Sequence, residues 1–184
     1  MASAALIVID MLNPYDHDDA DELAAHVEHV VAPLGRLIDG ARESDMELVY
    51  VNDNYEDFAA SRDQMVERAL GGRHPELVEP IAPGEGCDLL QKVRHSAFYS
   101  TSLEYLLQQR EVTQVILTGQ VTEQCILYTA LDAYVRHYSV CVPSDAVAAI
   151  DPALGDAALQ MMRRNMRAEI VAADDLLQGM PART

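Results

Sequence analysis

The amino-acid sequence predicts an α/β fold, a three-layer α/β/α sandwich built on a six-stranded, mostly parallel sheet. Two observations predict it. Short apolar runs of strand length alternate with longer stretches of helical period, and most of the expected strands are followed by a helix. Such alternation favours parallel strands covered by helices on both faces. In doubly wound sheets of this kind, the active site lies beyond the carboxyl ends of the strands.

Six segments are expected to be strands because they are short and apolar: residues 4–11, 46–52, 88–93, 114–119, 138–143 and 168–173. Five longer segments carry apolar residues at helical spacing and are expected to be helices: residues 20–44, 58–70, 101–110, 122–137 and 151–166. Thr101 or Ser102 is a candidate cap for the third of these helices. Residues 71–87 are rich in Pro and Gly and predict a loop. We expect one domain over residues 1–184.

The charge and the cysteines of the chain limit its partners and its location. The formal net charge is −17, so we expect neither nucleic acid nor an anionic membrane surface as a partner. No apolar run approaches the roughly 18 residues that a membrane span needs, and the N-terminus lacks the basic region of a signal peptide. The three cysteines are odd in number and lack metal-type spacing, which indicates a cytoplasmic protein without a disulfide framework.

Three chemically active side chains fall at or near expected strand ends. Asp10 directly follows four apolar residues, and Lys92, the only lysine of the chain, ends the third expected strand. Cys125 falls in the first turn of an expected helix that Thr122 is placed to cap. Unpaired backbone N–H groups and the helix dipole at such a position lower the pKa of a thiol. Together, the three residues supply a general base, a cation and a nucleophile.

Each of these residues also has a structural interpretation. Asp10 could cap a turn with Asn13. Lys92 could be the one lysine left by the codon bias of a GC-rich genome. Cys125 could be an inert core thiol, which is what we expect of the other two cysteines. None of the six histidines falls in a catalytic pattern, and we expect them to be surface or structural residues.

Three segments resemble the isochorismatase-like cysteine hydrolases, the superfamily of nicotinamidases, N-carbamoylsarcosine amidases and isochorismatases. Residues 6–13, LIVIDMLN, resemble the opening strand with its catalytic aspartate. Residues 92–107, KVRHSAFYSTSLEYLL, resemble the lysine segment. Residues 117–149, LTGQVTEQCILYTALDAYVRHYSVCVPSDAVAA, resemble the nucleophile segment and the strand after it. The segments occur in the family's order, and the similarity spans roughly residues 4–173.

The resemblance implies a catalytic triad of Asp10, Lys92 and Cys125. It also implies a non-proline cis peptide before the motif threonine, here Val121–Thr122, with backbone N–H groups that form an oxyanion hole. A small-molecule substrate and a homo-oligomer, either a dimer or a tetramer, are implied as well. A triad of this kind explains the lone lysine, because a guanidinium cannot replace a compact, titratable ammonium.

The sequence departs from the nicotinamidases at their Asp-x-His metal motif. Asp53 and Asn54 match the first two positions, but Tyr55 stands where the histidine would be. We therefore expect no metal and no other cofactor, since a catalytic zinc needs about three protein ligands, and this departure counts against nicotinamidase activity. Candidate pocket residues are those that flank the motif ends: Tyr15, Asn54, Tyr55, Phe98 and Tyr99.

The expected function is hydrolysis of a small-molecule amide or related C–N bond through an acyl-enzyme. True isochorismatases act on a vinyl ether and commonly lack the cysteine nucleophile, so Cys125 favours acyl transfer. Two alternatives stay open. One is isochorismatase-type hydrolysis of a vinyl ether, and the other is a catalytically silent binding protein of the same fold.

Overall fold

Seven parallel strands form a single sheet in the computed structural model, which describes residues 3–179. The sheet order is β3-β2-β1-β4-β5-β7, and β6 pairs with the end of β4. The strands are β1 (Ser3–Ile9), β2 (Glu47–Asp53), β3 (Asp88–Lys92), β4 (Val112–Gln120), β5 (Ser139–Pro143), β6 (Val147–Ala148) and β7 (Glu169–Val171). The α/β class is confirmed, with one strand more than the six predicted. β6 was missed because two residues are too few to show a strand pattern.

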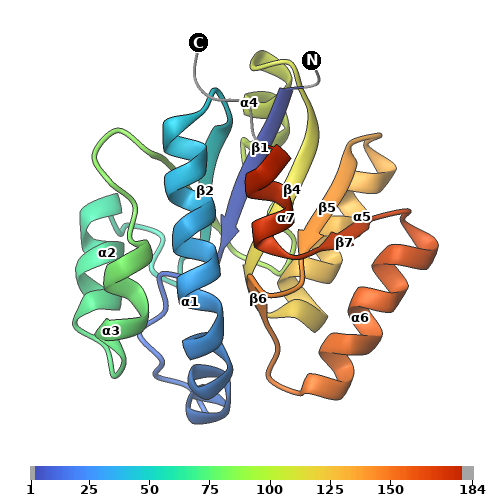
Figure 1. Cartoon of the computed structure of the whole chain (residues 1–184). Coiled ribbons are helices and arrows are strands. Elements are labelled where there is room, and N and C mark those ends of the chain that lie inside the picture. The colour runs from blue at the N-terminus through green and yellow to red at the C-terminus, as the bar shows by residue number, and fades with distance from the viewer. Residues whose placement is uncertain (1–2, 180–184) are drawn as a thin grey trace.

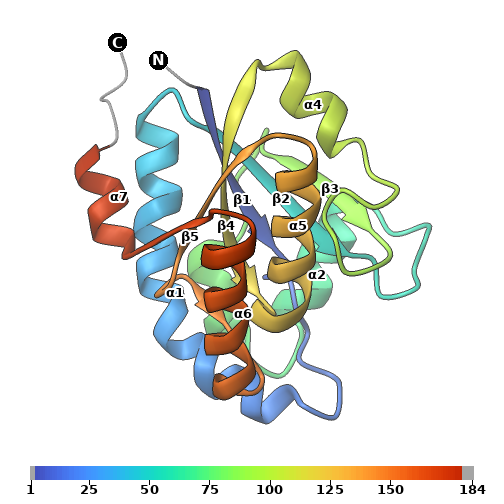
Figure 2. The ribbon, with the colours of Figure 1, turned by 90° about the vertical axis from the view of Figure 1, so that its right-hand side faces the viewer.

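Helices cover both faces of the sheet and complete three layers. They are α1 (Ala20–Glu43), α2 (Arg62–Leu70), α3 (Pro75–Val78), the 3₁₀ turn η1 (Glu79–Ile81), α4 (Leu103–Gln109), the π-helical turn η2 (Thr122–Ile126), α5 (Leu127–Val135), α6 (Pro152–Asn165) and α7 (Ala173–Gly179). Figure 1 shows α1 and α7 in front of the strands. Turned by 90°, Figure 2 shows α4 and α5 on the opposite side. Among the described residues, no helix has the length and apolar character to cross a membrane.

Local hydrogen bonds explain where the helices differ from the sequence prediction. α2 begins at Arg62 instead of residue 58, because Ser61 and Gln64 form a reciprocal capping box. Ser102 occupies the cap position of α4, but the Thr101 hydroxyl accepts the hydrogen bond from the backbone of Leu103. The segment predicted as a loop contains α3 and η1, and α7 after the last strand was not predicted.

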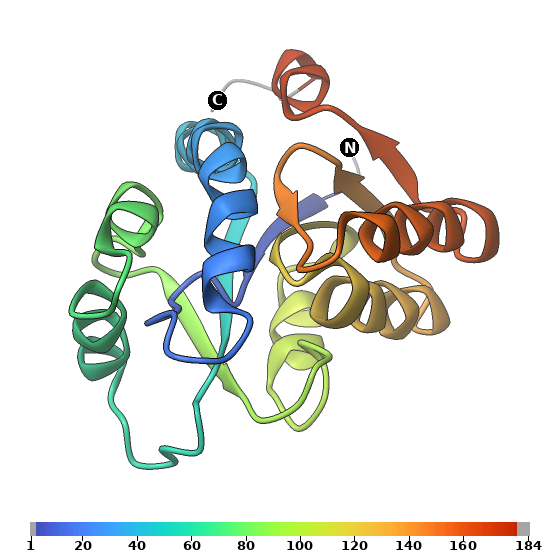
Figure 3. The same cartoon turned by 90° about the horizontal axis from the view of Figure 1, so that it is seen from below.

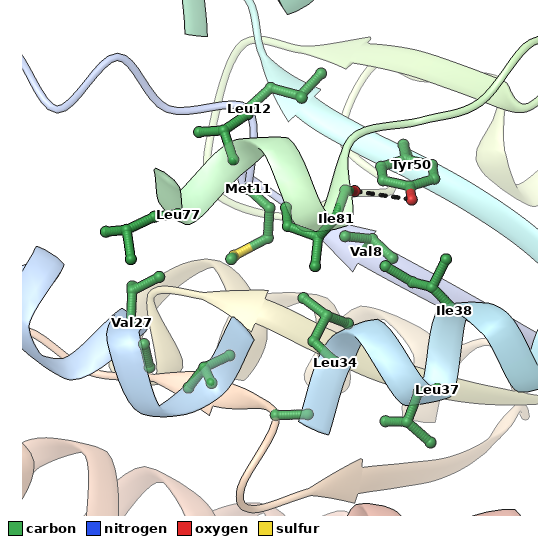
Figure 4. Close-up of a cluster of buried hydrophobic side chains, with 14 of the residues drawn as sticks. Val8, Met11, Leu12, Val27, Leu34, Leu37, Ile38, Tyr50, Leu77 and Ile81 are labelled. Atoms are coloured by element: carbon green, nitrogen blue, oxygen red, sulfur yellow. Dashed lines mark hydrogen bonds between the residues drawn. The ribbon is translucent and has the colours of Figure 1, made fainter. Parts of the chain in front are cut away.

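The core consists of two clusters, one on each face of the sheet. Along β1, Leu6 and Val8 belong to the cluster beneath α1, whereas Ala5, Ile7 and Ile9 belong to the cluster beneath α4, α5 and α6. Figure 4 shows the first of these clusters, in which the Tyr50 hydroxyl donates to the Ile81 carbonyl at 3.0 Å. Because both faces are buried, the central strands are almost continuously apolar.

The sheet order places one crevice between β1 and β4. From β1 the chain builds outward through β2 to β3, and from β4 it builds the other way through β5 to β7. The carboxyl ends of adjacent β1 and β4 therefore form the topological switch point, where doubly wound sheets bind ligands. Asp10 directly follows β1, and η2 follows β4 after one residue. Figure 3 shows this end of the molecule.

Close approach of β4 to β1 at this crevice requires Gly119. Its φ is +106°, and a Cβ there would lie 2.1 Å from the Ile9 carbonyl oxygen. That carbonyl belongs to the backbone of a central strand, so it cannot turn away as a flexible side chain would. Gly119 thus lets β4 pass directly beside the residue that precedes Asp10.

We predict that Gly119→Ala destabilises the protein by about 2 kcal/mol or more, because the new methyl group meets backbone and L-residues avoid this φ. Gly35→Ala is the matched control. Gly35 lies within α1, where a Cβ would have no neighbour closer than 4.0 Å, so alanine should stabilise by about 0.5–1 kcal/mol. Urea unfolding of both variants measures the difference. Equal stabilities would contradict the role given to Gly119.

Candidate active site

Asp10, Lys92 and Cys125 meet at the switch point. The Lys92 Nζ atom lies 2.8 Å from Asp10 Oδ2 and 3.7 Å from Cys125 Sγ. The Cys125 thiol is also close enough to Asp10 for each of the two groups to shift the pKa of the other. All three side chains are buried, with Lys92 only 1% exposed. The structure thus brings together the three residues that the sequence singled out.

Asp10 is held by its neighbours on β2 and β3. Its backbone N–H donates to the Val51 carbonyl at 3.0 Å, and its Oδ1 accepts the Asp53 N–H at 2.8 Å. The other carboxylate oxygen faces Lys92. The alternative in which Asp10 caps a turn with Asn13 is wrong, because the Asn13 side chain accepts the Tyr15 N–H instead. The Asp10 carboxylate is therefore oriented toward the buried ammonium.

Lys92 has a second carboxylate neighbour that sequence reasoning did not assign to the site. Asp53 Oδ2 lies 3.6 Å from the Lys92 Nζ, and the two residues are register partners at the ends of β2 and β3. The signal was present in the sequence. A carboxylate ends the second strand and a lysine ends the third, and the carboxyl ends of adjacent parallel strands lie side by side.

Cys125 lies in the π-helical turn η2 and not in an α-helical first turn. The Ile126 N–H donates to the Val121 carbonyl at 3.2 Å, and α5 begins only at Leu127. Val121 occupies the cap position without a side-chain hydrogen bond, so the predicted capping by Thr122 is wrong. The turn nevertheless aims the thiol at Asp10 and Lys92.

The cis peptide lies between Gln120 and Val121, one residue earlier than the predicted Val121–Thr122 bond. β4 continues to Gln120, whose side-chain amide donates to the Asp10 carbonyl at 2.7 Å. With Gln120 fixed in this way, the chain leaves the sheet directly after it. The family motif places the bond only approximately, and no side chain in this stretch marks it.

The electrostatics of the thiol differ from the sequence prediction. Burial is the main cause that raises the pKa of Cys125 to about 12, and the nearby charge of Asp10 adds to it. The Lys92 ammonium and a backbone hydrogen bond from Val121 lower the pKa, but by less. The lowered pKa predicted from a helix N-terminus is therefore wrong, because the dry surroundings outweigh the dipole.

Burial also shifts the pKa values of the two charged partners, Asp10 and Lys92. Burial raises the pKa of Asp10, and the neighbouring ammonium and the hydrogen bonds from Cys125 and Asp53 offset only part of that effect. For Lys92, burial alone would lower the pKa, but Asp10, Cys125 and Asp53 reverse the direction and raise it. The Asp10 carboxylate thus has an increased proton affinity and lies next to the protonated Cys125 thiol. Asp10 is therefore suited to accept the thiol proton.

The five pocket candidates lie in different environments. Tyr15 is fully buried and donates to the Gln120 side chain at 3.4 Å, and Phe98 packs in the core against Tyr138. These two predictions are corrected, because neither side chain reaches an open pocket. Asn54 and Tyr55 line a cavity of about 30 Å³, and Tyr99 is exposed.

Tyr55 occupies the position of the histidine in the nicotinamidase metal motif. Its hydroxyl donates to the Leu12 carbonyl at 3.3 Å. Burial and the charges of Asp10 and Asp53 raise the pKa of this hydroxyl, so it stays neutral. Among residues 3–179, no group of three or more His, Cys, Asp or Glu side chains is arranged to hold a metal ion.

Comparison with known proteins agrees with this fold. The isochorismatase domain model matches residues 4–175. YaaI of Bacillus subtilis, an uncharacterized isochorismatase family protein, is 33% identical, and the match covers 96% of this chain and 98% of that protein. The crystal structure of N-carbamoylsarcosine amidase from Thermoplasma acidophilum has 32% identity and a TM-score of 0.71, with 94% and 97% coverage. A probable inactive nicotinamidase of Arabidopsis thaliana is 30% identical, with 88% of each chain covered. The chain therefore belongs to the isochorismatase family, whose members are hydrolases.

Proposed function

We propose that this protein hydrolyses an amide or related C–N bond of a small molecule, with Asp10, Lys92 and Cys125 as its catalytic residues. The observation that carries the proposal is their mutual contact, with an ammonium 2.8 Å from a carboxylate and 3.7 Å from a thiol. The likeness to N-carbamoylsarcosine amidase supports a C–N bond as the target. The position of the site at the switch point supports a small-molecule substrate.

Catalysis begins with transfer of the Cys125 proton to Asp10. The thiolate sulfur attacks the substrate carbonyl carbon, and the C–N bond breaks as the Asp10 proton passes to the leaving nitrogen. A water molecule then gives a proton to Asp10 and attacks the thioester, which breaks the C–S bond and releases the acid. The proton returns to the sulfur. Lys92 stays an ammonium throughout and keeps the carboxylate and the sulfur in place.

The oxyanion of each tetrahedral intermediate needs hydrogen-bond donors close to the sulfur. We propose the backbone N–H groups around Val121 and Thr122 for this role. In support, the backbone of Val121 lies near enough to the Cys125 sulfur to lower the pKa of the thiol. Donors fixed in the backbone need no reorganisation as charge develops, which is the basis of their catalytic effect.

Two other functions predict different products. A vinyl ether hydrolase would release a carbonyl compound and no amine, and a binding protein would release nothing. The Arabidopsis relative named as a probable inactive nicotinamidase keeps the second alternative relevant. A screen of small amides and ureides for ammonia release, with Cys125→Ser as the blank, tests the proposal. Turnover of an enol ether but of no amide would overturn it.

We further propose that residues 1–184 act as one cytoplasmic domain without a bound cofactor. The match of a single family model to residues 4–175 supports one domain. The free thiols of Cys87, Cys125 and Cys141 suit a reducing compartment, where thiols are kept reduced.

The homo-oligomer suggested by the sequence is also a proposal. We propose that its subunit interface is the outer surface of α4, α5 and α6. Within residues 3–179, eight of the ten large hydrophobic side chains that are exposed lie on or beside these helices: Tyr99, Tyr105, Tyr128, Leu131, Tyr134, Val135, Leu154 and Met161. Patches of this kind mark interaction sites. The three helices carry three carboxylates and two arginines. This near-neutral face is where a chain of charge −17 can meet a second copy of itself with little repulsion.

Alkylation of Cys125 tests the protonation state of the nucleophile. In a Cys87→Ser background, which removes the most accessible thiol, we expect iodoacetamide to label Cys125 before the fully buried Cys141. Because the pKa of Cys125 is raised to about 12, the thiolate fraction rises about tenfold per pH unit below that value. The rate should thus climb without a plateau from about pH 7 to about pH 9. A plateau in that range, or prior labelling of Cys141, would count against the site.

Replacement of the lone lysine tests whether charge alone suffices. We expect Lys92→Arg to lower kcat/KM by about 10³-fold or more, nearly as much as Lys92→Ala, because a planar guanidinium cannot take the place of a fully buried ammonium. Turnover of the amide found by the screen is the measurement, with thermal melts to confirm folding. Near wild-type activity of Lys92→Arg would reduce the residue to a generic charge.

Self-association is tested by a charge on the proposed face. Leu131→Glu should shift the protein toward the monomer in sedimentation velocity, since desolvating a charge at an interface is costly. Phe58→Glu is the control, because Phe58 is also an exposed apolar residue but lies away from these helices. A monomeric wild type, or an equal effect of both variants, would refute the assignment.

A further inference from the structure

We propose that Asp53 is a positioning residue of this site, which holds the Lys92 ammonium as a second carboxylate beside Asp10 and makes the charge around the ion pair net negative. The proposal extends the proposed function, since it takes Cys125 as the reactive thiol. It assigns a role to a residue outside the triad, and it specifies the charge of the molecules that the site accepts.

The first support is the way Asp53 contacts both charged members of the triad. Its backbone N–H donates to Asp10 Oδ1 at 2.8 Å, and its own Oδ2 lies 3.6 Å from Lys92 Nζ. Its Oδ1 accepts the Tyr55 N–H at 2.8 Å, which fixes the side-chain rotamer. One residue therefore orients the base through its backbone and the cation through its side chain.

The second support is the count of charges. The charged groups around Lys92 are Asp10 after β1 and Asp53 at the end of β2, and Lys92 itself ends β3 with its Nζ atom 3.7 Å from the Cys125 sulfur. Two carboxylates and one ammonium leave a net charge of −1. Tyr55 is neutral, and the Arg68 guanidinium lies outside, 5.3 Å from the centre of the Tyr55 ring.

The third support is the difference in solvent exposure among the three charged side chains. The Asp53 side chain is 33% exposed, whereas that of Asp10 is 11% and that of Lys92 is 1% exposed. Of the three charged side chains, Asp53 is therefore the one most exposed to a molecule that arrives from solvent. An anion next to the sulfur is repelled in these partly dry surroundings, where charges are poorly screened. The site should accept neutral carbonyl groups, such as a carboxamide or a urea, ahead of carboxylates.

Two alkylating agents of similar size and different charge test this inference without knowledge of the substrate. Iodoacetamide is neutral and iodoacetate is an anion. The experiment uses the Cys87→Ser background and measures the rate of iodoacetamide labelling at Cys125 over the rate of iodoacetate labelling. This ratio is divided by the same ratio for free cysteine, and the normalised ratio reports the local charge. The thiolate fraction cancels in the ratio. With Asp53 intact, we expect Cys125 to react faster with iodoacetamide than with iodoacetate, relative to free cysteine. Asp53→Asn should lower the normalised ratio about fivefold or more.

Asp57→Asn is the matched control, because Asp57 lies on the same loop and caps the Ala59 N–H without contact to Lys92. It should leave the ratio unchanged. Asp53→Ser is the second variant, in which a hydroxyl can still accept the Tyr55 N–H, and it should behave as Asp53→Asn does. Thermal melts show whether either variant is folded.

The outcomes separate the two proposals. Labelling of Cys125 with an unchanged ratio in folded Asp53→Asn and Asp53→Ser would overturn the role of Asp53 and leave the proposed function intact. A similar drop in Asp57→Asn would do the same, since the effect would then be one of general surface charge. Peptide mapping that finds no label on Cys125 with either reagent would instead overturn the proposed function.

Discussion

A buried ion pair, Lys92 with Asp10, is the interaction on which the candidate site depends. Lys92 is almost completely removed from water, so its ammonium must be compensated by nearby carboxylates or lose its proton. Asp10 at 2.8 Å and Asp53 at 3.6 Å supply that compensation. Removing one partner of such a buried pair typically costs about 3–5 kcal/mol, because the other charge is left unpaired. The ends of β1, β2 and β3 are thereby fixed relative to one another.

The rest of the fold serves this arrangement. The central strands are buried on both faces, which holds their carboxyl ends in register. Gly119 lets β4 approach the end of β1, and Gln120 then donates to the Asp10 backbone carbonyl. The η2 turn follows directly and presents Cys125. A mobile loop could not hold a thiol at this distance from an ion pair, whereas strand ends packed on two cores can.

The strand positions, and the strand ends at which Asp10 and Lys92 lie, could be predicted from the sequence because they depend on patterns with a physical period. An apolar run that ends in Asp10, and another that ends beside Lys92, predict strands and polar residues at their ends. The two-residue strand β6 and the short helix α3 have no such period. The cis peptide was implied by the family resemblance alone and was placed one residue too late, at Val121–Thr122 instead of Gln120–Val121. Tyr15 was placed in the pocket by its proximity to a motif, but its side chain turns into the core, which depends on packing that a linear sequence does not display.

The largest error of the sequence prediction concerns the pKa of the thiol, and it bears directly on the proposed mechanism. A cysteine at an exposed helix N-terminus would be a thiolate at rest, since dipole and water both favour the anion. Cys125 instead lies in a dry turn beside Asp10, and burial with that carboxylate raises its pKa to about 12. The carboxylate next to its proton is that of Asp10, whose own pKa is raised by burial. Moving the proton from sulfur to oxygen transfers the negative charge over a short distance and leaves the net charge of the site unchanged. Lys92 contacts both atoms, so it stabilises the charge before and after the transfer. In the mechanism proposed above, the nucleophile is therefore activated by a proton transfer among these three residues, at little electrostatic cost, and not by a resting thiolate.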